Sequence, residues 1–182
     1  MELFAANGYD DTTVENIAQA VGISLRSFFR YFMSKGDLMS FALLLFGEQL
    51  AAAVDGCPDG YSVREVFRES VAAVANAGLR NEARTRKHLK ILKLSPAAAS
   101  AEMLRLQEVQ AHVAKAYQRR LPETPERAVT AAAIAGVSIH LTGVVVRWCL
   151  ERGQADASNA IERVLGGMEG IFCRGKTGHR NV

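Results

Sequence analysis

The sequence has few of the residues that would cross-link it or hold a structural metal. Its 182 residues include three cysteines, Cys57, Cys149 and Cys173, and no CxxC pair. A disulfide framework normally needs an even set of cysteines, and a zinc site needs closely spaced ligands. We therefore expect reduced thiols, no metal and no other cofactor.

The motifs of common enzyme classes are also missing. The chain has no HExxH, GxSxG, GxGxxG or GxxxxGK[ST], and its four histidines are scattered without a recognisable spacing. Those motifs supply metal ligands, nucleophiles and phosphate-binding loops. We therefore expect no catalytic residues, and an enzyme is the weaker alternative.

One long stretch lacks charge. Residues 128–146 contain no charged side chain, although Arg127 and Arg147 flank them. This length approaches that of a membrane-spanning helix, but a helix that is apolar all round can equally be buried within a protein. No basic, apolar leader is visible around Glu2-Leu3-Phe4. We expect a buried helix, no membrane partner and a cytoplasmic protein.

What the chain does contain is helical periodicity. Hydrophobic residues make up 49% of it and recur at spacings of three and four, and no segment alternates with period two. Gly78 is expected to break one helix, and Thr124 with Pro125 is expected to start another. The predicted helices are 1–7, 13–21, 24–32, 34–54, 62–77, a basic helix ending before Ser95-Pro96, 97–121, 124–151 and 157–173. The fold class is therefore all-α with about nine helices, and the tail 174–182 is expected to fray.

Residues 12–32 organise the rest of the chain. Thr13 is an N-cap candidate for the first of two short helices, and Gly22 is expected to end that helix. Ser24 is expected to cap the second helix, which Phe28 and Phe32 anchor inward from positions one turn apart. The pattern predicts two short helices joined by a tight turn.

The outer face of the second helix has the side chains needed to contact DNA. Arg26 can donate two hydrogen bonds to a guanine edge, and Ser27 can reach a base or a phosphate. Leu25 and Phe29 lie at the margin, where they can contact a thymine methyl group. A buried aromatic stripe with solvated arginines is the alternative, but residues 29 and 31 cannot share the face of Phe28 at 100° per residue.

This segment resembles the helix-turn-helix of the TetR family of bacterial transcriptional regulators. The resemblance is carried by Leu3-Phe4-Ala5, Gly8-Tyr9, Thr12-Thr13, Ile17-Ala18, Gly22-Ile23-Ser24, Phe29-Arg30-Tyr31-Phe32 and Ser34-Lys35-Asp37-Leu38. It implies a three-helix DNA-binding domain over residues 1–38, with the motif at 13–32. It also implies that Thr13, Tyr31 and Lys35 hold phosphates, beside the readout positions Ser24, Leu25, Arg26, Ser27 and Phe29.

Two observations weaken the electrostatic case for DNA. Residues 1–40 hold three bases (Arg26, Arg30, Lys35) and five acids (Glu2, Asp10, Asp11, Glu15, Asp37), a net charge of −2. Family members also begin with a basic arm and a full first helix, whereas this chain begins near the middle of that helix. We expect the start to be missing from the sequence; a trimmed domain with weaker DNA affinity is the alternative.

The resemblance assigns residues 39–182 to effector binding and dimerisation. The candidate pocket residues are Phe41, Leu45, Leu89, Leu92, Met103, Leu106, Tyr117, His140 and Trp148. The candidate dimer residues are Ala132, Gly136, Ile139, Gly143, Ile161, Val164, Leu165 and Met168. Residues 80–120 carry ten bases and three acids, net +7, which we interpret as a solvated face; binding of an anionic effector or a second nucleic-acid surface is the alternative.

The sequence thus predicts a homodimeric repressor that binds a palindromic operator in double-stranded DNA and is released by a small, largely apolar effector. A helical ligand-binding or scaffolding protein with a defunct DNA-binding module is the alternative. Sequence-selective, salt-dependent DNA binding would separate the two.

Overall fold

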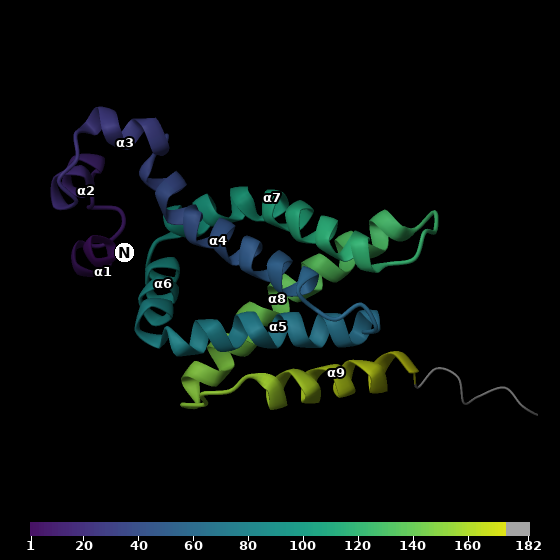
Figure 1. Cartoon of the computed structure of the whole chain (residues 1–182). Coiled ribbons are helices and arrows are strands. Elements are labelled where there is room, and N and C mark those ends of the chain that lie inside the picture. The colour runs from purple at the N-terminus through teal and green to yellow at the C-terminus, as the bar shows by residue number, and fades with distance from the viewer. Residues whose placement is uncertain (174–182) are drawn as a thin grey trace, which may run out of the picture.

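The computed structural model describes residues 1–173, which form nine α-helices and no strand (Figure 1). The helices are α1 (Glu2–Asn7), α2 (Val14–Ala20), α3 (Leu25–Tyr31), α4 (Lys35–Asp55), α5 (Val63–Arg80), α6 (Glu82–Leu94), α7 (Pro96–Arg120), α8 (Arg127–Glu151) and α9 (Ser158–Cys173). The predicted all-α fold is confirmed. The tail 174–182 and the side chain of Cys173 lie outside the described residues; Cys57 and Cys149 are free thiols.

Two predicted helix ends were wrong. Helix α5 continues through Gly78 to Arg80, because one interior glycine costs only about 1 kcal/mol and the buried face of α5 outweighs that. Helix α8 begins at Arg127, and Thr124 does not cap it. The carbonyl of Thr124 instead accepts a hydrogen bond from the Arg127 amide at 3.1 Å, which closes a turn before the helix.

The molecule has a main core and a smaller second core. Helices α4, α5, α7 and α8 supply most of the main core, and α9 lies along α5 (Figure 1). The second core joins Phe4, Phe28 and Met39 to Ile91 of α6 and Ala98 of α7. Helices α1–α3 are therefore held against α6 and α7 at one end of the bundle.

Helix α4 connects the two cores without a break. It runs from Lys35 to Asp55, so the proposed boundary between residues 38 and 39 lies inside it. Met39 belongs to the second core, and Leu50 and Val54 to the main core. One continuous helix therefore joins the two cores.

Two described helices, α4 and α8, are long and apolar enough to cross a membrane by length and composition alone. The uncharged stretch 128–146 lies in α8, whereas α4 was not among the sequence-based candidates. Both helices contribute fully buried side chains to the main core, such as Leu50 and Cys149. Of the apolar windows of α4 and α8, 33% and 39% are buried, so packing within the chain accounts for only part of their apolar character.

Candidate nucleic-acid interface

Helices α2 and α3 are fixed by caps within their own segment. The Thr13 hydroxyl accepts from the Asn16 amide at 3.2 Å, and the Asn16 side chain accepts from the Thr13 amide at 3.0 Å. Gly22 then turns the chain with a φ of 70°, which side-chain-bearing residues rarely adopt. The Ser24 hydroxyl accepts from the Ser27 amide at 3.1 Å, so α3 begins at Leu25.

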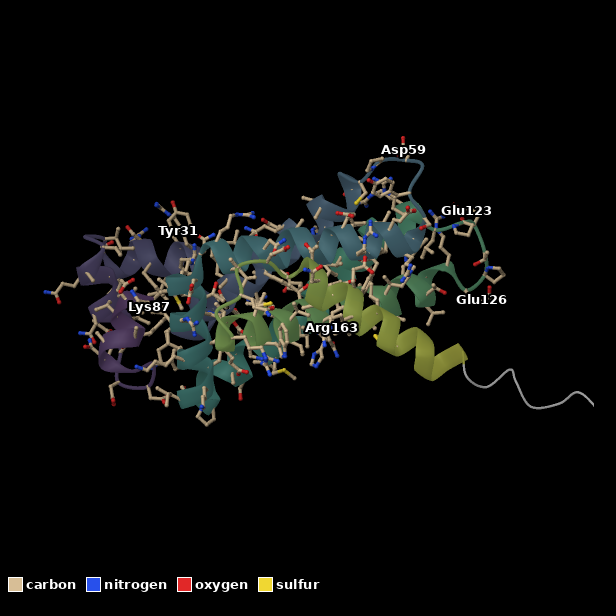
Figure 2. All side chains as sticks on the ribbon, turned by 90° about the horizontal axis from the view of Figure 1, so that it is seen from below. Tyr31, Asp59, Lys87, Glu123, Glu126 and Arg163 are labelled. Carbon is tan, nitrogen blue, oxygen red and sulfur yellow. The ribbon has the colours of Figure 1, made fainter. Side chains whose placement is uncertain are left out.

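Aromatic packing decides which face of α3 is turned outward. Phe28 is buried, and its ring meets Phe29 edge-on at 5.5 Å and Phe32 at 5.6 Å. Phe29 and Tyr31 remain 53% and 67% exposed. Figure 2 shows the Tyr31 side chain pointing away from the ribbon at the α1–α3 end of the molecule, opposite the end marked by Asp59 and Glu126.

The two arginines of α3 differ in what they contact. Arg30 donates to the Tyr31 hydroxyl at 2.9 Å, with its guanidinium 4.8 Å from the centre of that ring. Arg26 is exposed and makes no hydrogen bond or ion pair with another described residue. Its guanidinium is therefore available for a bidentate contact from the N-terminal half of α3. Ser27 is half-buried, and its hydroxyl lies 3.0 Å from that of Ser24.

The ammonium of Lys35 is already hydrogen-bonded within the chain, so binding a phosphate would require it to give up one of these hydrogen bonds. Its ammonium donates to the carbonyls of Tyr9, Asp10 and Thr12 at 2.7, 2.9 and 3.1 Å, and it lies 4.6 Å from the centre of the Tyr9 ring. An ammonium has three donors, and all three are used. Lys35 therefore closes the loop between α1 and α2 and positions the motif.

The acids of residues 1–40 are largely turned away from α3. Both Glu2 oxygens accept from Lys87 of α6, at 2.7 and 2.6 Å. Asp37 pairs with Arg105 of α7, and Asp10 accepts from the Ser95 hydroxyl at 3.1 Å. Two of the five negative charges are thus matched by cations outside the segment. The net charge of −2 overstates the negative potential at the recognition face.

Half of the basic residues in the stretch 80–120 are engaged in ion pairs. Five of its ten bases pair with acids, namely Arg86 with Glu82, Lys87 with Glu2, Arg105 with Asp37, Arg119 with Asp55 and Arg120 with Asp59. Three of these pairs, Lys87–Glu2, Arg105–Asp37 and Arg119–Asp55, join two helices, which supports the interpretation as a solvated structural face.

A cavity of about 360 Å³ lies among α4, α5, α6 and α8, with Glu102 of α7 also in its wall. Three predicted residues line it: Leu45, Leu89 and Leu92. The other six lie elsewhere. Phe41, Met103 and His140 are exposed, and Leu106 and Trp148 are half-buried outside the lining. Tyr117 is fully buried in the core, where Ser70 and Ser138 lie 3.1 and 2.8 Å from its hydroxyl.

The main polar pair of this cavity, His88 and Glu102, was not among the predicted residues. His88 Nε2 lies 2.6 Å from Glu102 Oε1, and both side chains are largely shielded from solvent. The helical spacing of Thr85, His88, Leu89 and Leu92 places all four on one face of α6. Because Leu89 and Leu92 were already candidate pocket residues, the same spacing could have identified His88 as a pocket residue. Glu102 comes from α7, and nothing in the sequence joins it to α6.

The predicted dimer residues of α8 point mostly inward. Ala132 and Ile139 pack against the main core, and a Cβ on Gly136 would lie 3.2 Å from the Gln110 side chain. Ile139 and Gly143 line the cavity. The outward face of α8 instead carries Val129, Val137 and Val144.

On α9 the predicted residues divide between core and surface. Ile161 is fully buried within its own chain, so it cannot contact a second copy in this structure. Leu165 packs on the main core and Met168 is half-buried. Val164 is 39% exposed and remains available.

Comparisons with known proteins agree with the geometry of α1–α3. The sequence model described as "Bacterial regulatory proteins, tetR family" matches residues 1–40. A Mycobacterium tuberculosis protein named as a transcriptional regulator of mycofactocin biosynthesis, MftR, is 30% identical over 96 residues, 53% of this chain and 48% of its own length. The HTH-type transcriptional regulator TcmR of Streptomyces glaucescens is 38% identical over 74 residues, 41% of this chain and 33% of its own.

The matches therefore span about half or less of the length of these relatives. The family model covers the two capped helices, the turn at Gly22 and the exposed face of α3, which together form a helix-turn-helix. Residues 1–40 match the model of the TetR family of bacterial regulatory proteins, and together with the two relatives this match supports a TetR-family regulator.

Proposed function

We propose that this chain is a DNA-binding transcriptional regulator that reads its site with α3. The observation that supports this most strongly is the exposed Arg26 near the N-terminus of a capped α3. A recognition helix contacts base edges with its N-terminal residues, and arginine is the commonest partner of guanine. Phe29 and Leu25 beside it offer apolar contact to a thymine methyl group. Both named relatives are transcriptional regulators.

The proposed regulator acts as a homodimer on a palindromic operator. The valines of the outward face of α8 are 68%, 42% and 42% exposed at positions 129, 137 and 144, and Val164 of α9 is 39% exposed. Apolar side chains in such a row favour burial against a second copy across a two-fold axis. Two α3 helices would then lie roughly 34 Å apart, one turn of DNA.

The effector in this proposal acts through α6. One side of α6 contributes Thr85, His88 and Leu89 to the cavity. On other positions of the same helix, Lys87 binds Glu2 and Ile91 belongs to the second core. An effector that binds the cavity in only one conformation of the protein shifts the population toward that conformation. In the proposed mechanism this conformation re-orients α1–α3, so the protein leaves the operator. The protein is then a repressor that the effector releases.

An electrophoretic shift assay on the DNA upstream of the gene tests the DNA-binding proposal. Arg26→Ala is expected to cost about 1–3 kcal/mol and to relax specificity at one base position. Lys115→Ala on α7 removes the same charge far from α3 and serves as the control. Binding that is absent, or insensitive to sequence and to Arg26, would favour the ligand-binding alternative. Turnover of a substrate without DNA binding would favour an enzyme.

A further inference from the structure

The cavity contains two buried polar atoms that have no hydrogen-bond partner among the described residues. They are His88 Nδ1 and Glu102 Oε1. His88 Nε2 lies 2.6 Å from Glu102 Oε1, a charge-assisted contact distance, although the geometry does not make a well-formed hydrogen bond. A buried polar atom left unpaired is costly, so such atoms commonly mark where another molecule binds.

The carboxylate of Glu102 determines which imidazole nitrogen of His88 is a hydrogen-bond donor and which is free to accept from a ligand in the cavity. It accepts and never donates when ionised, so the imidazole nitrogen facing it, Nε2, carries hydrogen. Nδ1 is then an acceptor in the neutral ring and a donor in the protonated ring. A hydroxyl group satisfies Nδ1 in both states, because it both donates and accepts.

The charges around the pair disfavour an ionic ligand. An anion at Nδ1 would lie close to the Glu102 carboxylate, and a cation in the cavity would face the guanidinium groups of Arg84 and Arg147. The remaining wall is mostly aliphatic and aromatic, including Leu45, Phe46 and Val146. The Thr85 and Thr142 hydroxyls already donate to the carbonyls of Gly78 and Ser138 at 2.9 and 2.7 Å.

We propose that the cavity binds an uncharged, mainly apolar ring compound whose hydroxyl group meets His88 Nδ1. This rests on the proposed function, in which the cavity holds the effector, and it names the chemical class of that effector. The cavity volume of about 360 Å³ is near the lower end for small-molecule sites, which suits a compound of a few rings.

Fluorescence titration of the full chain with three probes of one shape tests this class. The probes are 2-naphthol, 2-methylnaphthalene and 2-naphthoate, which carry a hydroxyl, a methyl and a carboxylate on the same ring system. The wild-type protein is expected to bind 2-naphthol about tenfold more tightly than 2-methylnaphthalene, the effect of one satisfied buried hydrogen bond.

Two variants identify the atom responsible. Asparagine in His88→Asn places its amide where Nδ1 lies, whereas glutamine in His88→Gln places its amide where Nε2 lies. The preference for 2-naphthol is therefore expected to survive in His88→Asn and to fall below about twofold in His88→Gln. Thermal melting of both variants confirms that they are folded before the titrations are compared.

Three outcomes would overturn the proposal: equal affinity for the hydroxyl and methyl probes, a preference for 2-naphthoate, or no binding of any probe. A naphthoate preference would assign the cavity to an anionic ligand held by Arg84 and Arg147. The DNA shift assay is read separately. If 2-naphthol binds through His88 while operator binding is absent, the ligand class stands and the proposed regulatory function fails.

Discussion

At the scale of single residues, Lys35 has the most clearly defined structural role in the DNA-binding unit. Its ammonium donates to three carbonyl groups in the loop between α1 and α2, at Tyr9, Asp10 and Thr12. Those carbonyls come before the N-cap of α2. The position of α2, and of α3 beyond Gly22, therefore depends on a side chain from the first turn of α4.

Replacing Lys35 by methionine keeps the aliphatic stem and removes all three donors. We expect Lys35→Met to lower the free energy of unfolding by about 1–3 kcal/mol, because two part-buried hydrogen bonds, to the carbonyls of Tyr9 and Thr12, and an exposed one, to that of Asp10, are lost. Thermal denaturation followed by circular dichroism measures this, with Lys115→Met as the control. An unchanged melting temperature together with uniformly weaker DNA binding would instead assign Lys35 to phosphate contact.

Asp37 gives the protein a specific sensitivity to acid. The Met33 amide donates to it at 3.2 Å and Arg105 pairs with it, and these two hydrogen bonds lower the pKa of the Asp37 carboxyl below its usual 3.8. Because the folded pKa is the lower one, the stabilisation is present above pH 3.8 and is lost as pH falls through the folded pKa.

Stability measured between pH 6 and pH 3 tests this linkage. The wild-type protein is expected to lose stability at the acid end, and Asp37→Asn is expected to be less stable at pH 6 and to lose less on acidification. Asp59→Asn, in an exposed loop, serves as the matched control and should follow the wild type. Parallel curves for the wild type and Asp37→Asn would contradict the assignment.

At the scale of helices, the crossing of α4 and α7 requires a glycine. A Cβ built on Gly47 would lie 2.6 Å from Cγ1 of Val109, which is itself 2% exposed. Val109 is branched at Cβ and stiff in a helix, so it cannot move aside cheaply. The close approach holds α7 against the helix that carries α1–α3.

Gly47→Ala is therefore expected to destabilise the fold by about 1–3 kcal/mol, despite the higher helix propensity of alanine. The same change at Gly143 of α8, where no atom lies within 4 Å of the added Cβ, should be neutral or stabilising. Chemical denaturation of both variants gives the comparison. If Gly47→Ala is as stable as Gly143→Ala, the two helices are not as tightly packed as described.

At the scale of the whole molecule, one long apolar face is left uncovered within the single chain. Among the described residues it is the outward face of α8, with Val129, Val137 and Val144; Val164 on α9 is also exposed. The proposed dimer would bury this face and place a second α1–α3 unit at a fixed distance from the first.

Sedimentation velocity of the double variant Val137→Glu with Val144→Glu tests that assembly. The wild type is expected to sediment as a dimer and the variant as a monomer, because two charges would be buried on each side of the interface. Leu104→Glu on α7 is the control, since Leu104 is 83% exposed but lies off the proposed face. A monomeric wild type, or a dimeric double variant, would contradict the proposal.

The sequence by itself determined the helices, the two caps at Thr13 and Ser24, and the outward position of Arg26. These features depend on interactions between residues three or four positions apart, which periodicity and residue type reveal directly. Its resemblance to the TetR family came from the same short segment, residues 1–40.

Only the tertiary structure decided how the long helices face one another. Leu45, Leu89 and Leu92 line the cavity, whereas Tyr117 belongs to the core, and Ile139 and Gly143 face the cavity rather than solvent. Lys35 likewise binds carbonyls rather than standing free. The reason is that α8 is apolar all round and core, cavity and interface use the same residue types, so only contacts between distant segments separate them.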